Sequence, residues 1–234
     1  MGWDNSYNVS LSDLSYDFPI ATPGAYVDSR SDVHEQGVYV QDHLRFQNGV
    51  TVTAGLRRAW VENRTLDRLA GTDPTQKDHA TTGMLGATWD LGDGYVPYAS
   101  YGESIVTNIG QTFAGAQYRP TKGKQLEAGL RYSPEGSGQM LSGAIFSIEK
   151  TNVLTSDPLN TGFSVQTGKV RYRGVELEAR GALTEQLSVI AGYSYLDAKV
   201  LSSEDGDRGN TPALVPRHAA SVWAEMMRRG WSRG

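Results

Sequence analysis

The stretch KGKQLEAGLRY at residues 122–132 decides the fold class, because it alternates without a slip from Gln125 onward. One face of it carries Leu126, Ala128, Leu130 and Tyr132, and the other carries Gln, Glu, Gly and Arg. Successive side chains of a strand point to opposite sides, so this period of two predicts a β-strand. The apolar face could pack on a protein core, or it could face lipid while the polar face lines a wet lumen.

The same alternation recurs along the chain in segments of about ten residues, separated by turn signals. The expected strands are 37–46, 50–60, 81–91, 95–104, 125–133, 139–150, 170–183, 187–200 and 218–226. Short turns such as Gln47-Asn48-Gly49 alternate with long polar loops, expected at 62–80, 105–124, 151–170 and 201–216. A membrane barrel sorts its connections this way, with short turns in the periplasm and long loops outside. A Greek-key β-sandwich has no reason to do so.

Composition narrows the function classes. The chain has 234 residues, 38% of them hydrophobic, and no apolar run near the roughly 18 residues that a membrane-spanning helix needs. A net charge of −4 argues against nucleic acid as a partner, and the absence of Cys excludes disulfides. The N-terminus MGWDNSYNVS lacks the pattern of a signal peptide, so we expect either a chain that is not exported or one whose true beginning is missing.

The faces of the expected strands favour a membrane barrel over a soluble β-sandwich. Glu and Arg occur near the middle of the strands at 125–133 and 174–181, where a watery lumen or a polar plug would accommodate them. Aromatic residues near strand ends match the girdles that Tyr and Trp form at membrane interfaces, although they could also fill a sandwich core. These aromatic residues are Trp60, Trp89, Tyr95, Tyr132, Tyr193 and Tyr195.

We therefore predict an all-β fold: an antiparallel, up-and-down transmembrane β-barrel, present in part as about nine to ten strands. Residues 1–33 are expected to form an extracellular loop region, 34–227 the partial barrel, and 228–234 an irregular tail.

Seven segments resemble, in order and spacing, the TonB-dependent outer-membrane receptors, in particular siderophore receptors of the ferrichrome type. They are GVYVQDHLRFQNGVTVTAGLR, PYASYGES, PTKGKQLEAGLRY, KTNVLTSDP, RGVELEARGAL, GYSYLDAKV and GNTPALVPRHAASVWAE, and the resemblance covers essentially residues 36–225. The resemblance implies a barrel of about 22 strands with a plugged lumen. It also implies a bacterial outer-membrane receptor, surrounded by lipid, that takes up ferric siderophores with energy from the TonB complex.

The same resemblance shows which parts of the family pattern have no counterpart here. The plug domain, the segment that contacts TonB, the early strands and the last strands are not matched. We therefore expect a central barrel fragment whose basic tail at 228–234 is a truncated or frameshifted end. We also expect that a nine-stranded piece with two open edges would not insert as a working transporter, because unpaired backbone groups are costly in hydrocarbon.

No catalytic residue, metal site or cofactor is predicted, and the ferric siderophore is expected only as a transported ligand. The four His residues lack metal-ligand spacing, and no catalytic motif occurs. Glu176 and Glu178 are interpreted as a polar lumen wall rather than an acid–base pair. The acidic segment SSEDGDRGN at 202–210 hints at a calcium loop, but its spacing favours a solvated loop.

Aromatic side chains on the expected outer loops are the candidates for siderophore contact, because they can stack on a rounded, neutral chelate. These candidates are Tyr16, Phe18, Tyr26, Phe113 and Tyr118, with ordinary loop packing as the alternative. Three other functions remain open at this stage. They are a passive porin or autotransporter barrel, a barrel enzyme such as a phospholipase, and a soluble β-sandwich binding module.

Overall fold

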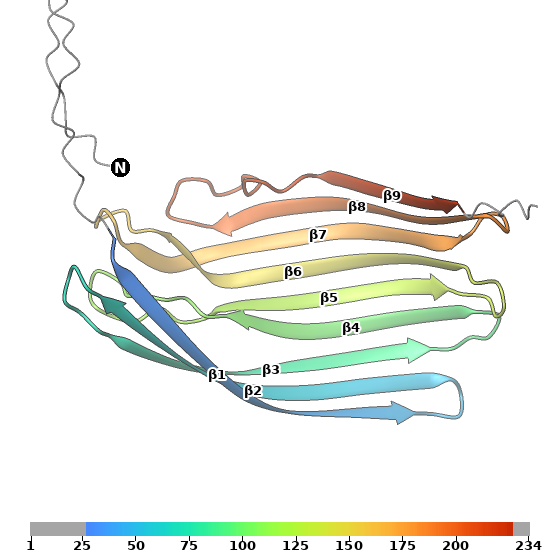
Figure 1. Ribbon diagram of the computed structural model, residues 1–234, viewed down its shortest axis with the longest axis horizontal. Coiled ribbons are helices and arrows are strands. Elements are labelled where there is room, and N and C mark those ends of the chain that lie inside the picture. Colours follow the sequence, from blue (N-terminus) through green and yellow to red (C-terminus); the bar gives the residue numbers. More distant parts are fainter. Residues whose placement is uncertain (1–26, 227–234) are drawn as a thin grey trace, which may run out of the picture.

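The computed structural model describes residues 27–226, which form one antiparallel sheet of nine strands in sequence order (Figure 1). The strands are β1 (Ser29–Arg45), β2 (Val50–Asp67), β3 (Thr75–Trp89), β4 (Tyr95–Val106), β5 (Thr121–Tyr132), β6 (Met140–Ser156), β7 (Ser164–Ala182), β8 (Leu187–Ser202) and β9 (His218–Met226). Each strand pairs with the next one along the chain, so the predicted up-and-down β topology is confirmed.

The strand register gathers apolar residues on one face of the sheet, which we call the outer face. Ala128 of β5 lies between Ala99 of β4 and Ile145 of β6, and Ile145 pairs with Val175 of β7. The opposite, inner face carries the polar residues of the same strands, including Glu127 of β5. Side chains alternate along every strand, and in this register the apolar positions of neighbouring strands lie opposite each other. The apolar residues of all strands therefore share one face of the sheet.

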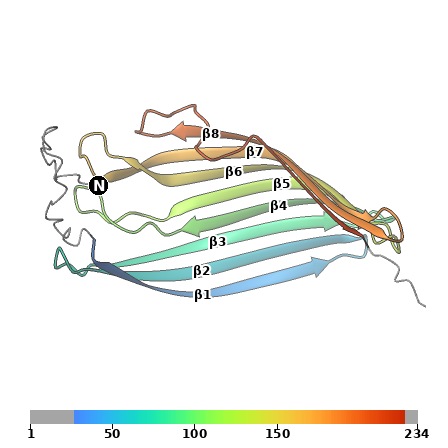
Figure 2. The same cartoon turned by 45° about the horizontal axis from the view of Figure 1, so that its top comes forward.

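The apolar outer face is not covered by protein within the described residues. Leu126 is 60% exposed, Leu130 44% and Leu177 52%, and the two views of the sheet show no second layer (Figures 1 and 2). A soluble β-sandwich would bury these rows against its second sheet. Residues 27–226 therefore do not form a β-sandwich by themselves. Residues 27–226 also contain no helix long and apolar enough to cross a membrane.

The few buried apolar side chains lie near the end of the sheet that holds the longer connections, which we call the long-loop end. They are Ala59, Val61, Tyr118, Val170, Ala198 and Val200. The four connections at the opposite end, the turn end, are 46–49, 90–94, 133–139 and 183–186. The protein therefore buries apolar surface where loops fold back on strands, and not in the middle of the sheet.

Strands run further toward the long-loop end than the alternation predicted. The expected loop 62–80 shrinks to 68–74, and the expected loop 151–170 shrinks to 157–163. These two connections are no longer than the turn at 133–139, so the predicted contrast between short turns and long loops holds only for 107–120 and 203–217.

The strand ends were missed because water surrounds both faces of these hairpins near their tips, so both faces can be polar. Glu62, Asn63 and Arg64 are paired in β2, but they are polar on both faces, so no period of two marks them as strand. Strand pairing depends on backbone hydrogen bonds and persists without an apolar face. The first strand is likewise longer than predicted, because β1 begins at Ser29, inside the segment 1–33 that was assigned to a loop.

Two neighbouring strands separate near the long-loop end. β3 pairs with β4 only from Met84 to Thr88, and from Thr75 to Gly83 it pairs with β2 alone. The carboxylate of Glu103 on β4 spans part of this gap, because it accepts a hydrogen bond from the Gly83 backbone at 3.3 Å. The gap leaves room at the inner face for the loop 107–120.

Candidate ligand-binding surface at the long-loop end

The loop 107–120 between β4 and β5 is held against the inner face of the β2–β3 hairpin mainly by the buried side chain of Gln76, and the Gln117 amide adds a hydrogen bond to the Thr75 carbonyl oxygen at 3.3 Å. The Gln76 amide nitrogen on β3 donates to the backbone oxygens of Asn108, at 2.9 Å, and Tyr118, at 3.0 Å. Its amide oxygen accepts from the Gly110 backbone at 3.3 Å. Side-chain hydrogen bonds thus connect β3 to the loop where β3 makes no sheet hydrogen bonds with β4.

The other side of the loop is tied to β7 (Ser164–Ala182). The Gln166 amide oxygen accepts from the Arg119 backbone at 2.6 Å, and the Tyr118 hydroxyl donates to the Ser164 carbonyl oxygen at 3.2 Å. Asn108 closes the base of the loop by donating to the Arg119 carbonyl oxygen at 2.9 Å. The loop is therefore held between β3 and β7 and does not extend freely from the β4–β5 hairpin.

A cavity of about 640 Å³ lies between this loop and the tip of the β2–β3 hairpin. Its lining is rich in amides and hydroxyls and comprises Asn63, Thr65, Thr72, Asp73, Pro74, Gln76, Ile109, Gly110, Gln111 and Gln117. Asp73 is the only ionisable residue in this lining, and it forms an ion pair with Arg64 at the hairpin tip. Cavities of several hundred cubic ångströms with a few polar groups are the usual form of small-molecule sites.

The predicted ligand residues are placed as follows. Tyr16, Phe18 and Tyr26 lie outside the described residues. Tyr118 is 7% exposed and fixed by its hydroxyl, whereas Phe113, at the loop tip, is 62% exposed. The rings of Phe113 and of Phe163, which lies on the β6–β7 connection, pack nearly perpendicular to each other with centroids 5.2 Å apart. Among the described residues, Phe113 and Tyr118 share the loop 107–120, and the role of all five residues in ligand contact stays a prediction.

Sequence reasoning missed the residues that build the cavity. Asn63 and Gln76 are 3% and 6% exposed and pair across β2 and β3. Both stood inside the segment 62–80 that was interpreted as a loop, so their polar character suggested solvent rather than burial. A polar residue that is buried to brace a loop has no periodic signal of its own, because its partners are backbone atoms far away in the sequence.

The inner wall of the sheet below this cavity is polar and connected by hydrogen bonds. The Tyr98 hydroxyl on β4 donates to the Glu127 carboxylate on β5 at 2.8 Å, and the Gln125 amide donates to the same carboxylate at 2.9 Å. A hollow of about 550 Å³ lies beside them, with Arg131, Glu176 and Glu178 in its lining. The expected polar wall is thus observed around Glu176 and Glu178.

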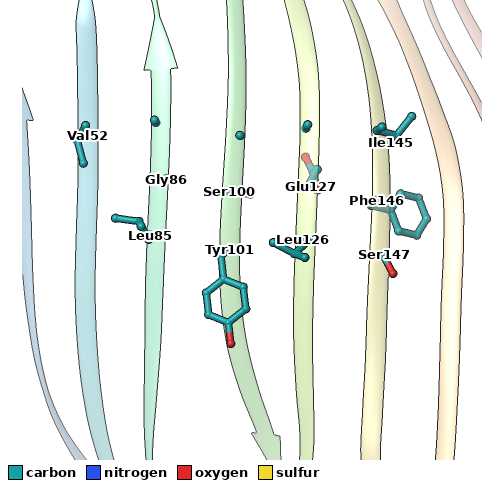
Figure 3. A pocket seen from close by; sticks show the side chains of 13 residues that line it. Val52, Leu85, Gly86, Ser100, Tyr101, Leu126, Glu127, Ile145, Phe146 and Ser147 are labelled. Carbon is teal, nitrogen blue, oxygen red and sulfur yellow. The ribbon is translucent and has the colours of Figure 1, made fainter.

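A second hollow, of about 670 Å³, has mostly apolar walls and does not belong to this polar surface (Figure 3). Most of its lining residues share the outer face, and Leu85, Tyr101 and Leu126 stand in one cross-strand row. Ala87, Ala99 and Ala128 form the next row toward the turn end, so smaller side chains lie beside larger ones there. This hollow therefore suits hydrocarbon rather than a polar ligand.

The acidic segment at 202–210 fastens a loop and does not gather a metal site. Asp205 accepts a hydrogen bond from the Ser156 backbone at 2.8 Å, and hydrogen bonding from Ser156 holds the pKa of Asp205 below its usual value. Gly209 and Asn210 pair with Val200 through backbone hydrogen bonds. Within residues 27–226 no group of three or more His, Asp or Glu side chains could hold a metal ion.

Known proteins similar in sequence are receptors, and one of them is named as an outer-membrane protein, as the apolar outer face and polar inner face of the sheet suggest. The ferrichrome outer membrane transporter/phage receptor of Escherichia coli (strain K12) is 40% identical over 191 residues, which are 82% of this chain and 25% of that protein. The ferrioxamine receptor of Yersinia enterocolitica is 32% identical over 215 residues, 92% of this chain and 30% of that protein. The chain thus spans about a quarter to a third of the length of these relatives.

Solved structures show the same fold. The ferric preacinetobactin receptor BauA of Acinetobacter baumannii superimposes with a TM-score of 0.73 at 27% identity, over 86% of this chain and 31% of that one. The siderophore receptor PiuA of the same species gives a TM-score of 0.75 at 22% identity, over 84% of this chain and 31% of that one. The Escherichia coli relative is named an outer membrane transporter, and an exposed apolar outer face is what contact with lipid requires.

The model of one protein family, "TonB dependent receptor-like, beta-barrel", matches residues 1–234. The exposed apolar outer face, the polar inner wall and the meander of nine antiparallel strands are the features that this match explains. The chain therefore belongs to the TonB-dependent receptors, and it is a segment of their outer-membrane β-barrel.

Proposed function

We propose that the chain forms part of a receptor that takes up a neutral ferric siderophore of the hydroxamate class, such as ferrichrome. The observation that carries this proposal is the cavity under the loop 107–120, which faces the bore at the long-loop end. Membership of the TonB-dependent receptors supports siderophore uptake in general. The relative named for ferrichrome, at 40% identity, supports the narrower substrate class.

The charge of the cavity favours a neutral chelate. Its lining offers amide and hydroxyl groups, and its single carboxylate, Asp73, is already paired with Arg64. A strongly anionic ferric catecholate would need unpaired cations at this surface, because buried charge without a partner is costly. A neutral hydroxamate chelate needs only hydrogen bonds and apolar contact, which Gln111, Gln117 and Ile109 supply.

Transport in this proposal requires no covalent chemistry by the barrel, and we assign no enzymatic activity to it. Iron stays coordinated by the chelator, so the wall needs hydrogen bonds and shape rather than metal ligands. Release into the periplasm is assigned to the plug domain and the TonB energy-coupling complex, the partners that the family implies.

Growth under iron limitation tests the proposal. The full-length receptor is expressed in a strain that lacks its own siderophore receptors, and iron is supplied as ferrichrome or as a ferric tricatecholate. We expect growth with ferrichrome alone, dependent on TonB. Growth with the tricatecholate alone, or with neither chelate while the receptor is folded in the outer membrane, would contradict the proposed substrate class.

A substitution of Gln76, which holds the loop 107–120, tests whether the cavity is the binding site. Gln76→Ala removes hydrogen bonds worth about 0.5–1.5 kcal/mol each, so the loop 107–120 should open more often. We expect about tenfold weaker ferrichrome binding, measured by tryptophan fluorescence quenching in detergent. Gln186→Ala, at the turn end, is the matched control and should bind as the unaltered protein does. Equal affinities of the two variants would remove the cavity from the binding site.

A further inference from the structure

The gap between β3 and β4 interrupts a ladder whose two strands both continue. β3 stays paired with β2 as far as Thr75, and β4 stays paired with β5 as far as Val106, yet β3 and β4 pair with each other only at residues 84–88 and 98–102. Figure 1 shows the β2–β3 hairpin running on past the arrowhead of β4. A hollow of about 290 Å³ lies at the gap, with Thr82 of β3 and Ser104 of β4 in its lining.

The backbone groups that face the gap from β3 form an open strand edge. The Gly83 N–H points toward β4, because it donates to the Glu103 carboxylate at 3.3 Å. Alternation along a strand directs the N–H and C=O groups of Lys77, His79 and Thr81 to the same side. Among residues 27–226 these groups have no hydrogen-bond partner across the gap. An edge of this kind is a template for pairing with another strand.

The continuation of β4 itself fits this edge in register. Met84 pairs with Gly102 in the existing ladder. The same register, continued residue by residue, sets Ala80 opposite Val106. The segments ATTG at 80–83 and ESIV at 103–106 contain no proline, so every backbone group that a longer ladder needs is present.

The contacts that hold the loop 107–120 inward are incompatible with that longer ladder. Continued pairing turns the backbone groups of Asn108 and Gly110 away from β3, because alternate residues of a strand face opposite edges. The Gln76 amide then loses its hydrogen bonds to the backbones of Asn108, Gly110 and Tyr118. The chain therefore satisfies either the Gln76 side chain or the edge of β3, and not both at once.

A buried acceptor also favours withdrawal of the loop. Asn63 pairs with Gln76 across β2 and β3 and is 3% exposed, and its side-chain oxygen accepts no hydrogen bond from the residues described. A buried polar atom without a partner costs free energy, and contact with water removes that cost. The open edge of β3 and the Asn63 oxygen thus oppose the hydrogen bonds of Gln76, which places two arrangements of the same strands in competition.

We propose that β3 and β4 exchange between a separated form and a form with a continuous ladder, which we call the zipped form. In the separated form the loop 107–120 lies over its cavity. In the zipped form the ladder runs on from Met84 and Gly102 through Ala80 and Val106, the hollow between the strands is filled, and the loop leaves the inner face. The exchange is a property of the strands and goes beyond the proposed function, because it does not depend on which siderophore is bound.

Disulfide trapping in outer membranes that contain the full-length receptor tests for the zipped form. The chain itself has no cysteine, and any cysteine elsewhere in the receptor is replaced by serine. Ala80→Cys with Val106→Cys should cross-link under copper–phenanthroline, because paired strands bring opposite Cα atoms to about 4.5–5.5 Å, within reach of a disulfide. Met84→Cys with Gly102→Cys, inside the existing ladder, is the positive control. Ala80→Cys with Ser104→Cys, two residues out of register, is the negative control and should not cross-link.

A further substitution connects the cross-linking rate to the loop. Gln76→Ala removes hydrogen bonds that only the separated form makes, so the 80–106 pair should cross-link about tenfold faster in that background. Gln186→Ala, at the turn end, should leave the rate unchanged. The fast-migrating gel band of each reduced variant shows that it is folded, a readout that does not depend on the siderophore.

Two results would overturn the proposal. One is cross-linking of the 80–106 pair no faster than that of the out-of-register pair, and the other is a rate that Gln76→Ala leaves unchanged. Both are measured without a siderophore, so they are distinct from the growth test of the proposed function.

Discussion

Glycine has a specific packing role where an aromatic side chain lies across the neighbouring strand of the inner face. Gly174 of β7 pairs with Phe146 of β6, and a Cβ at Gly174 would lie 2.6 Å from that ring. Gly129 of β5 pairs with Tyr98 of β4 in the same way, with the ring 2.7 Å from the added atom. These glycines let an aromatic ring lie flat over the sheet, which covers backbone that a glycine leaves bare.

Gly174→Ala should therefore destabilise the barrel. The new methyl group would also lie 2.4 Å from the Tyr195 carbonyl oxygen, a backbone atom that cannot move alone. Overpacking of this kind costs about 1–3 kcal/mol. The check is the temperature at which the folded, fast-migrating gel band of the receptor disappears. Gly102→Ala, where a Cβ meets nothing within 4 Å, is the control and should unfold at the original temperature.

Asp205 makes the fastening of the loop 203–217 depend on pH. Hydrogen bonds from Ser156 lower the pKa of this carboxyl, so its folded pKa lies below its value in an open loop. The stabilisation is present above the open-loop pKa, near about 4, and is lost as the pH falls through the folded pKa. Amide exchange of Ser156, corrected for the intrinsic rate, should speed up below about pH 4. Asp205→Asn should remove that pH dependence, and an unchanged profile would show that another group titrates.

The strands, as elements, divide into a lipid-facing part and a part that stands in water. β2 shows both, because Leu56 is exposed on the outer face, whereas Asn63, nearer the tip, is buried under the inner-face loop. Only the first part carries the period-two pattern. The sequence therefore predicts the middle of each strand well and its outer end poorly, since polar residues on both faces are compatible with strand and loop alike.

Leu130→Arg should be costly because it puts a charge on the lipid face. Leu130 is 44% exposed on the outer face, and a charged residue on the lipid face costs up to about 2–4 kcal/mol at the midplane and less toward the interface. Gln125→Arg on the inner face of the same strand should change stability much less, because that side meets a polar bore. Urea unfolding of the full-length receptor in lipid vesicles compares the two. Equal destabilisation by both variants would contradict the assignment of the two faces.

The loop 107–120 shows what an element gains from distant residues. Its position between β3 and β7 depends on Gln76, Tyr118 and Gln166, which come from β3, the loop itself and β7. Sequence reasoning placed Tyr118 in a ligand-binding loop but had no means of showing that its hydroxyl is bound to β7. The candidate cavity exists only because these contacts fold the loop inward.

At the scale of the whole molecule, the described sheet is open. β1 and β9 each pair on one side only, so their outer backbone groups find no partner strand among residues 27–226. In hydrocarbon each unpaired backbone group costs several kcal/mol, which is why membrane sheets close into barrels. The sheet is therefore stable in a bilayer only as part of a closed ring.

Residues 1–234 produced alone should fail to insert into lipid vesicles as a monomer. The open edges of β1 and β9 should instead drive aggregation, because exposed strand edges pair with one another. Protease protection and analytical ultracentrifugation measure insertion and size. The full-length receptor in the same vesicles is the control, and a monomeric, protected form of the isolated segment would refute the expectation.

The sequence by itself determined the all-β class, the strand order of the meander and which side chains face lipid. These properties are local, because a period of two fixes the face of every residue as soon as the segment is known to be a strand. Only the tertiary structure decided where the strands end, that β3 and β4 separate, and that Gln76 draws the loop 107–120 over a cavity. Those features arise from hydrogen bonds between residues far apart in the chain, and such pairings leave no periodic trace in the sequence.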